Sequence, residues 1–370
     1  MSRFLPEPAF SHERPARLGV LLINLGTPDA PTASAVRRYL AEFLSDPRVV
    51  EIPRAVWKPL LHGLILRVRP ARSADRYANI WTKDGSPLLV HSQRQRSLLL
   101  GYLGQRLKAL GLPSDHAQVE LGMRYGSPSI TEALARLREG RCDRILLMPL
   151  YPQYASSTTG SALDAVFSAT RTMRRVPALR AADVYHDDAG YIGALAQSIN
   201  EYWVKNGRPN KLVLSFHGVP RRTLDLGDPY HCHCQKTARL LATELGLRPE
   251  QYVVAFQSRF GRGEWLKPYT RATLVALAKE GMRRVDVACP GFVSDCLETL
   301  EEIGLEGRSA FLEAGGAEFH AIPCLNERPA WIAVLAGLVL ENLGGWLDAP
   351  PDAAARELTQ ARAKAGGAAA

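Results

Sequence analysis

Three short segments in the first half of the chain recur, in the same order, in the second half. Each joins the end of a strand-like run to a turn that contains Gly or Pro. The paired segments are 21–28 with 212–220, 122–126 with 257–261, and 142–149 with 283–290. Chance similarity explains any single pair, but three pairs in one order favour an internal duplication. A duplicated strand-and-turn unit limits the fold to two similar α/β halves.

Apolar runs separated by helical segments give the expected element order. Short, continuous apolar runs are typical of strands buried in parallel sheets. The runs predict strands over 19–25, 119–123, 145–150, 212–216, 252–257 and 285–288, and a helix over about 34–43. Because strands alternate with helices, each half is expected to form an open, doubly wound parallel sheet. With 370 residues, the chain also exceeds the usual size of a single core, so two domains are expected.

The duplication sets the expected domain limits. The first paired segments lie further apart than the other two pairs, so the first half contains extra chain. The expected parts are a flexible N-terminus over 1–17, a first domain over 18–185 with a helical insert at about 46–100, a second domain over 186–325, a helix within 326–348, and a tail over 349–370 read as a fraying helix and disorder.

The insert has an amphipathic helical pattern, with apolar residues from Trp57 to Leu66 followed by arginines. It is consistent with a lid over a cleft, a lip that touches a membrane, or simple packing on the first domain. No segment has the roughly 20 apolar residues that span a bilayer, and the polar N-terminus lacks the apolar core of a secretory signal. Six cysteines in so long a chain do not indicate a secreted disulfide framework. A cytoplasmic location is expected, with peripheral contact at the inner membrane left open.

Charge and motifs narrow the partners. The formal charge of +9 suits an acidic small molecule, an anionic membrane or nucleic acid, and equally a generic basic surface. No dense Lys/Arg run marks a nucleic-acid arm. No Gly-x-Gly-x-x-Gly follows the first strand, so no nucleotide is expected. The hydroxyl-rich segment 156–160 is not a Walker loop, although it could bind a carboxylate or cap a helix.

Two acid–base residues stand where a ligand site is expected. Open α/β sheets bind ligands beyond the carboxyl ends of their strands. His217 directly follows a predicted strand, and Glu298 lies where a run turns into a helix. A neutral imidazole takes a proton or a metal ion near pH 7, and a carboxylate shares either task. The alternative for His217 is a structural role in its turn.

Acidic residues continue beyond Glu298. Glu298, Glu302 and Glu306 are spaced four apart and would share one face of a regular helix, although Gly304 interrupts the pattern. Such a stripe is either a solvated face or a place where a cation relieves the repulsion between carboxylates. Carboxylates with an imidazole suit Fe²⁺ or Mg²⁺ better than a thiolate-seeking ion.

The segment His231-Cys-His-Cys234 also offers metal ligands, but they are too close together for a zinc finger. No second cysteine pair lies at finger spacing. An iron–sulfur cluster normally needs four thiolates. Cys289 and Cys296 would complete such a set only if the fold brought them to this segment.

Taken together, these motifs closely resemble those of ferrochelatases of the proteobacterial type. The matching segments are 22–28, 123–126, 151–160, 215–220, 256–261 with Trp265, and 289–298. The resemblance implies two Rossmann-like domains that face a cleft, and a C-terminal helix, at 331–343, that returns to the first domain. It implies the last step of haem biosynthesis, a lyase reaction that inserts Fe²⁺ into protoporphyrin IX and releases two protons.

The resemblance also assigns roles to residues. It implies that His217 and Glu298 form the catalytic and metal-binding pair. It implies that Leu25, Tyr125, Trp265 and Phe292 line the porphyrin cleft. Cys296 stands where many members have His, which puts a third nitrogen ligand in doubt.

The family's cluster-bearing members use a C-terminal cysteine group that this chain lacks. No iron–sulfur cluster is therefore expected, and no cofactor besides the substrate Fe²⁺. Two alternatives stay open. One is a chelatase for coproporphyrin III or another metal, and the other is a non-catalytic tetrapyrrole-binding protein.

Overall fold

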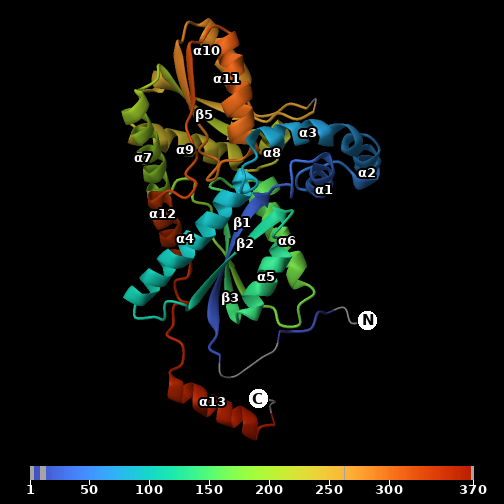
Figure 1. Ribbon diagram of the computed structural model, residues 1–370, viewed down its shortest axis with the longest axis vertical. Helices are drawn as coiled ribbons and strands as arrows, with labels where there is room; N and C mark the ends of the chain where they lie inside the picture. Colours follow the sequence, from blue (N-terminus) through green and yellow to red (C-terminus); the bar gives the residue numbers. More distant parts are fainter. Residues whose placement is uncertain (1–3, 9–13, 262, 368–370) are drawn as a thin grey trace.

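Each half of the chain builds a four-stranded parallel sheet, and the two sheets have the same strand order (Figure 1). The computed structural model describes residues 4–8, 14–261 and 263–367. The first sheet has the order β2-β1-β3-β4 and the second the order β6-β5-β7-β8. The strands are β1 (Arg17–Gly26), β2 (Ala117–Tyr125), β3 (Cys142–Pro149), β4 (Ala178–Ala181), β5 (Lys211–His217), β6 (Tyr252–Gln257), β7 (Arg284–Ala288) and β8 (Glu318–Ala321). The duplicated α/β fold expected from the sequence is confirmed.

Helices connect the strands in both halves. In the first half they are α1 (Ala33–Phe43), α2 (Arg54–Leu60), η1 (Leu61–Ile65), α3 (Leu66–Ile80), α4 (Pro87–Ala109), α5 (Ile130–Glu139), η2 (Ser156–Gly160), α6 (Ser161–Thr170) and α7 (Ala189–Asn206). In the second half they are α8 (Arg221–Asp225), α9 (Tyr230–Glu244), η3 (Pro249–Gln251), α10 (Thr270–Lys279), η4 (Glu298–Gly307), α11 (Arg308–Glu313) and α12 (Pro329–Asn342), with α13 (Ala353–Ala365) in the tail. The segments η1, η2 and η4 are π-helices.

The central strand of each sheet ends at a glycine pressed against the neighbouring strand. A Cβ atom on Gly26 would lie 1.8 Å from the Tyr125 carbonyl oxygen, and one on Gly218 would lie 2.6 Å from that of Gln257. Only glycine fits such close backbone approaches. Leu25 and His217, which precede these glycines, therefore occupy equivalent positions at the carboxyl ends of the two central strands.

The helix that follows the third strand of each half begins with π winding. In the first half η2 runs into α6, and in the second η4 runs into α11. π-Helices are rare and occur mostly as short insertions at functional sites. Their presence at the same place in both halves extends the duplication beyond the strands.

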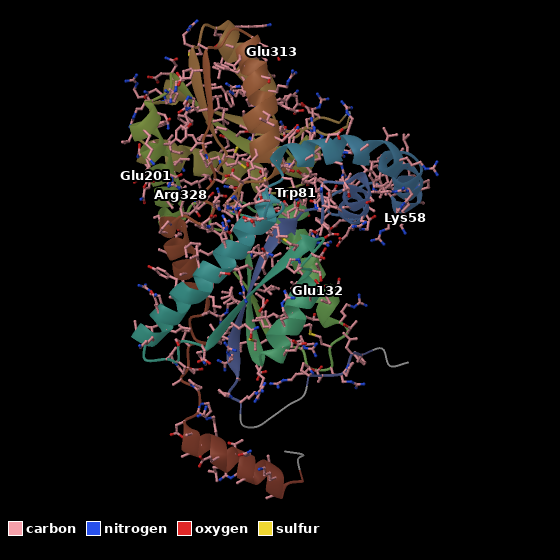
Figure 2. The ribbon with its side chains drawn as sticks, viewed as in Figure 1. Lys58, Trp81, Glu132, Glu201, Glu313 and Arg328 are labelled. Carbon is pink, nitrogen blue, oxygen red and sulfur yellow. The ribbon has the colours of Figure 1, made fainter. Side chains whose placement is uncertain are left out.

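Each half ends with a helix that packs on the other half. The helix α7 follows β4 yet packs on α9, and its Trp203 donates to Asp286 of β7 at 3.0 Å. The helix α12 follows β8 yet packs on α4 and β3 of the first half (Figure 1). Glu201 and Arg328, labelled in Figure 2, join α7 to the start of α12 by an ion pair of 2.8 Å. The two halves are thus interlocked.

The helical insert predicted at about 46–100 forms two separate parts, a projecting group of helices and a helix of the domain core. The helices α2, η1 and α3 (54–80), called the lip below, project to one side of the molecule together with α1 (Figure 1). Their inner surface forms an apolar cluster around Tyr39, Trp57 and Tyr77. The helix α4, by contrast, packs on β2 and α12 and belongs to the core of the first domain.

Both termini contain more structure than expected. The predicted flexible segment 1–17 lies partly outside the described residues. Within it, the Glu7 carboxylate accepts hydrogen bonds from the backbone N–H groups of Arg174 and Arg175, at 2.9 and 3.0 Å. In the tail, α13 is a helix whose first turn is capped by Asp352, and Figure 1 shows it apart from the two domains. Among the described residues, no helix is long and apolar enough to cross a membrane.

Candidate active site between the two domains

His217 is the last residue of β5, and its ring is fixed by its own turn. Its Nδ1 lies 2.6 Å from the carbonyl oxygen of Gly218. A carbonyl oxygen only accepts hydrogen bonds, so Nδ1 carries a proton, and in the neutral ring Nε2 has the lone pair. A fixed tautomer with a free Nε2 is ready to accept a proton or bind a metal ion.

Glu298 opens the π-helix η4 and is tied to the strand beside His217. Its backbone carbonyl accepts a 2.8 Å hydrogen bond from the Gln257 side chain, and Gln257 pairs with His217 in the sheet. Ser215 donates to the same Gln257 side chain at 2.6 Å, which fixes its orientation. Gln257, which the sequence analysis did not single out, thus connects the two candidate residues. The sequence signal that could have identified Gln257 is its position at the end of the predicted strand over 252–257.

Glu302 is a third ionisable group at this site. Ser258 holds it, with the backbone N–H donating to one carboxylate oxygen at 2.7 Å and the hydroxyl donating to the other at 2.5 Å. Burial raises the pKa of Glu302. The Ser258 hydrogen bonds and the His217 charge act against that rise, and the Glu298 charge adds to it. Glu302 therefore lies close enough to both His217 and Glu298 for their charges to act on it.

The expected acidic stripe is regrouped by the π winding. The predicted face of Glu298, Glu302 and Glu306 assumes regular helical spacing. In the structure Glu306 instead shares Arg76 of α3 with Glu301, while Glu302 faces Ser258. A π-helix closes each turn with about one more residue than an α-helix, so Glu301 and Glu306, five apart, come toward one side. The predicted single stripe is therefore divided, because Glu306 pairs with Arg76 while Glu302 faces Ser258.

The expected wall residues divide into two groups. Phe292 is half-buried, with its ring centroid 6.4 Å from that of His217. Trp265 is also half-buried and pairs with Pro220 in an isolated β-bridge. Leu25 is half-buried beside the lip's apolar cluster, where Leu297, the residue directly before η4, also packs. Phe292 and Trp265 thus lie beside the end of β5 in the second half, and Leu25 lies at the end of β1 in the first half and shares a cluster with the start of η4.

Tyr125 does not reach the surface of this site. It is fully buried, and its hydroxyl donates to Asp46 at 2.8 Å and lies 3.1 Å from the Ser161 hydroxyl. Its ring packs edge-on against Phe43. Because none of its surface is exposed, Tyr125 supports the wall from behind and does not form the wall itself.

Asp46 is the centre of a buried network that the sequence did not reveal. Arg124, Ser161 and Tyr125 all donate to its carboxylate, and the Arg48 N–H donates at 2.8 Å. Burial alone would raise the pKa of Asp46, but these hydrogen bonds and the Arg124 charge outweigh it and lower the pKa. The network fixes the carboxyl end of β2 against the start of α6.

Buried hydrogen bonds hold the two domains together beside the site. The Gln153 amide, after β3, donates to Thr237 at 3.0 Å and to the Pro290 carbonyl at 3.3 Å. The Ser156 N–H, at the start of η2, donates to the Asp228 carboxylate at 2.7 Å. The hydroxyl-rich segment 156–160 therefore binds a carboxylate, as its composition allows, and the carboxylate belongs to the protein itself.

The cysteine-containing segment 231–234 does not converge on one point. The His231 ring stacks on Phe256, and the His233 ring stacks on His186 at a centroid distance of 3.8 Å. Cys232 is exposed, whereas Cys234 is buried, as is Cys296. Within the described part of the chain, no group of three or more His, Cys, Asp or Glu side chains is arranged to hold a metal ion.

These features define the class of protein. It is a duplicated α/β protein in which the second half supplies a histidine, an acidic π-helix and two aromatic side chains, and the first half packs an apolar cluster against the start of that helix. Comparison with known sequences assigns the family. The family model described as Ferrochelatase matches residues 17–343.

Two curated relatives agree with that family match over nearly the whole chain. A ferrochelatase from Aromatoleum aromaticum is 58% identical over 369 residues, which cover 100% of both chains. One from Methylibium petroleiphilum is 59% identical over 360 residues, or 97% of each chain. Among solved structures, SirB from Bacillus subtilis with Fe3+ aligns at a TM-score of 0.49 and 12% identity, over 89% of this chain and 96% of that chain. The chain belongs to the ferrochelatase family, and its function is that of this family in haem biosynthesis.

Proposed function

We propose that this chain inserts Fe²⁺ into protoporphyrin IX, with His217 and Glu298 as the residues that exchange protons and the metal ion. The observation that carries the proposal is the fixed tautomer of His217. Its Nδ1 proton is committed to the Gly218 carbonyl, so Nε2 is free to act as a base. The π-helix that begins with Glu298 lies on the adjacent strand end, linked through Gln257.

The reaction needs both kinds of group. The iron ion replaces two pyrrole N–H protons, and a planar macrocycle shields its nitrogens from an approaching ion. His217 would take a proton through Nε2, the ring nitrogen that is not engaged with the Gly218 carbonyl. Glu298 would deliver the metal ion or receive the second proton, since carboxylate oxygens bind Fe²⁺. Glu302, whose pKa is raised by burial, is suited to take a proton from either neighbour.

The half-buried apolar residues would bind the ring. Leu25, Trp265 and Phe292 offer flat or branched apolar surface from two domains. Surfaces that hold a ring away from planarity spend binding energy on distortion, which lowers the barrier to metal entry. Tyr125 would contribute indirectly, by keeping Asp46 and the end of β2 in place.

The test is a direct insertion assay. We expect Fe²⁺ and Zn²⁺ to enter protoporphyrin IX in the presence of the protein, as followed by the absorbance of the metalloporphyrin. The same assay with coproporphyrin III separates the main alternative, a chelatase for another tetrapyrrole. Insertion into coproporphyrin III alone would contradict the proposed substrate, and tight porphyrin binding without insertion into either would indicate a non-catalytic binder.

We further propose that the lip rests on an anionic membrane surface. Four apolar residues of the lip are exposed, together with Ile52 just before it: Val56, Leu60, Leu64 and Val68. Exposed basic residues accompany them, among them Arg54 and Lys58, and Figure 2 shows Lys58 near the far end of the lip. An apolar stripe beside cations is the pattern of helices that lie in the membrane interface.

Vesicle co-sedimentation tests this contact. The protein should sediment with vesicles of phosphatidylglycerol and phosphatidylcholine, and less with phosphatidylcholine alone. The double variant Leu60→Ser/Leu64→Ser should lose most of the binding. Val204→Ser, which changes an exposed apolar residue on α7, is the matched control. Equal binding by the double variant and the control would contradict a role for the lip.

No iron–sulfur cluster is expected in the protein. Five of the six cysteines are buried, and only Cys232 is exposed. Analysis of the purified protein for acid-labile sulfide checks this expectation, and stoichiometric sulfide would contradict it.

A further inference from the structure

One guanidinium joins the lip to the π-helix that begins with Glu298. Arg76, on α3, donates from Nη2 to the Glu306 carboxylate, and its Nε lies 3.6 Å from a carboxylate oxygen of Glu301. The helices α3 and η4 are in direct contact, although they are far apart in the sequence and belong to different domains. Arg76 therefore connects the insert of the first half to the acidic helix of the second half.

The arrangement of these two carboxylates depends on how η4 is wound. Glu301 and Glu306 are five residues apart. Five residues of an α-helix make about 1.4 turns, which puts the two side chains on nearly opposite sides. In a π-helix each turn holds about one more residue than in an α-helix, so residues five apart come much closer to one side of the helix. The π winding of η4 therefore brings the two carboxylates within reach of one arginine.

The charges of η4 require such a partner. Four carboxylates lie within its ten residues. In the described part of the chain, Arg76 is the cation that forms ion pairs with them. Glu301 is only 5% exposed, and its second oxygen, Oε2, has no hydrogen-bond partner. Without Arg76 a buried carboxylate would be left uncompensated, which is costly.

The same helix of the lip also reaches the start of η4. Tyr77, the neighbour of Arg76, is buried in the lip's apolar cluster, where Leu297 also packs. Burial raises the pKa of Tyr77, and the negative charge of Glu298 adds to that rise, so the phenol lies near the carboxylate. The helix α3 therefore contacts η4 both near Glu298 and at the turn that contains Glu301 and Glu306.

We propose that Arg76 is a positioning residue that holds η4 in its π-wound form and thereby sets the orientation of Glu298. This inference rests on the proposed role of Glu298 in metal transfer. Arg76 itself touches neither the porphyrin nor the metal ion. Its effect on the reaction passes through the winding of the helix, so the lip and the geometry of the site are coupled.

The first test measures the helix directly. Arg76→Gln should speed backbone hydrogen exchange within 298–307, as measured by mass spectrometry, and leave α5 unchanged. Arg72→Gln, an exposed arginine one turn earlier on the same helix, is the matched control and should leave exchange in η4 unchanged. Equal exchange in η4 for the two variants would overturn the proposal. This measurement needs no activity, so it stands even if Glu298 proves dispensable for insertion.

The second test asks whether Arg76 acts through its ion pair with Glu306. Glu306→Gln removes that carboxylate and should speed exchange within 298–307 as Arg76→Gln does. Glu313→Gln, which changes an exposed carboxylate of α11, is the matched control and should leave exchange in η4 unchanged. Wild-type exchange in Glu306→Gln would overturn the proposal.

The kinetic consequence is a separate readout. Arg76→Gln and Glu306→Gln should each lower kcat/KM for Fe²⁺ by about threefold to tenfold, which corresponds to about 0.7–1.4 kcal/mol. The combined variant Arg76→Gln/Glu306→Gln should lose no more activity than either single variant, because both substitutions remove the same contact. The KM for the porphyrin should not change. Additive losses would show that the two residues act independently.

Discussion

The π-wound segments of the two halves occupy equivalent places but carry opposite chemistry. The segment η2 is built from hydroxyls and binds the protein's own Asp228 through a backbone N–H. The segment η4 is built from carboxylates and begins with Glu298. The duplication thus places two similar helix starts at the interface: a backbone N–H of η2 bonds to the other domain, and the side chains of η4 supply ionisable groups.

The carboxylates that contact the ends of the second strands, Asp46 in the first half and Glu302 in the second, show the same division. Asp46 accepts from Tyr125 and pairs with Arg124, and the pKa of Asp46 is lowered. Glu302 accepts from Ser258, no lysine or arginine pairs with it among the described residues, and its pKa is raised by burial. In the first half, the Asp46 carboxylate stabilises the folded chain through its pairing with Arg124. The second half keeps one that can change protonation during a reaction.

The largest expected effect comes from the equivalent positions Leu25 and His217. His217→Ala should lower kcat for metal insertion by about 10²- to 10⁴-fold, because the base is lost. Leu25→Ala should leave kcat within a few-fold and raise the KM for the porphyrin, because only apolar contact is lost. Steady-state kinetics with circular dichroism as a check on folding measure both. Comparable losses of kcat in the two variants would contradict the proposal that His217 acts as the base while Leu25 only contacts the porphyrin.

Glu298→Gln should match His217→Ala in its effect on insertion while binding porphyrin normally. The amide keeps the shape of the side chain but neither takes a proton nor binds Fe²⁺ strongly. Porphyrin fluorescence quenching measures the binding, and the insertion assay measures the loss. Glu313→Gln, an exposed carboxylate of α11 labelled in Figure 2, is the control and should retain full activity. A fully active Glu298→Gln protein would remove Glu298 from the mechanism.

The paired and unpaired carboxylates should differ in stability. Asp46→Asn should destabilise the protein by about 3 kcal/mol at pH 7, because it leaves Arg124 without its partner. Glu302→Gln should change the free energy of unfolding by no more than about 1 kcal/mol, because an amide oxygen can still accept from Ser258. Urea denaturation measures both values. Equal destabilisation would contradict the expectation that Asp46 contributes more than Glu302 to the stability of the folded protein.

The two carboxylates should also respond to pH in opposite directions. A lowered pKa in the folded state means that the stabilisation from Asp46 is present above the ordinary value of 3.8 and is lost as the pH falls. The deficit of Asp46→Asn should therefore shrink in acid. A raised pKa means that Glu302 favours folding at low pH, and that this contribution is lost as the pH rises above the ordinary value of 4.5. Denaturation series from pH 3 to pH 8 test both signs.

The smallest expected effect concerns the helices that follow the second strands. Ser129 caps α5 in a reciprocal capping box with Glu132, whereas α10, its counterpart, has no side-chain cap. Ser129→Ala should cost about 1 kcal/mol of stability without changing activity. Thr273→Ala, whose hydroxyl bonds only to a carbonyl within α10, should cost less. Thermal unfolding compares the two, and a larger loss for Thr273→Ala would contradict the expected difference between the helices.

The strands, the duplication and the positions of His217 and Glu298 were predictable because they depend on local patterns. Apolar runs mark buried strands, and strand ends mark the sites of open sheets. The strands β4 and β8 were missed because they are short and carry exposed residues at their ends, so they lack a continuous apolar run. These edge strands are defined by their neighbours and not by their own sequences.

The winding of η4 and the Asp46 network were not predictable from the sequence. An acidic segment with spacing of four reads as one α-helical face, and only tertiary contacts such as that of Arg76 separate Glu302 from Glu306. Asp46 lies in a polar loop whose pattern gives no sign that Arg124 will bury against it. Tyr125 was placed on the wall for the same reason, because its position at a strand end does not reveal that its hydroxyl is already occupied.

The interlocked helices have a consequence for how the protein is made. The helix α12 completes the flank of the first domain, where Trp331 stacks on Tyr185 and is fully buried. During translation the first sheet therefore emerges with this flank uncovered and stays so while the entire second half is synthesised. The apolar seam between Tyr185 and Trp331 can close only after α12 has emerged. We therefore expect the nascent first domain to bind a chaperone that shields exposed apolar surface.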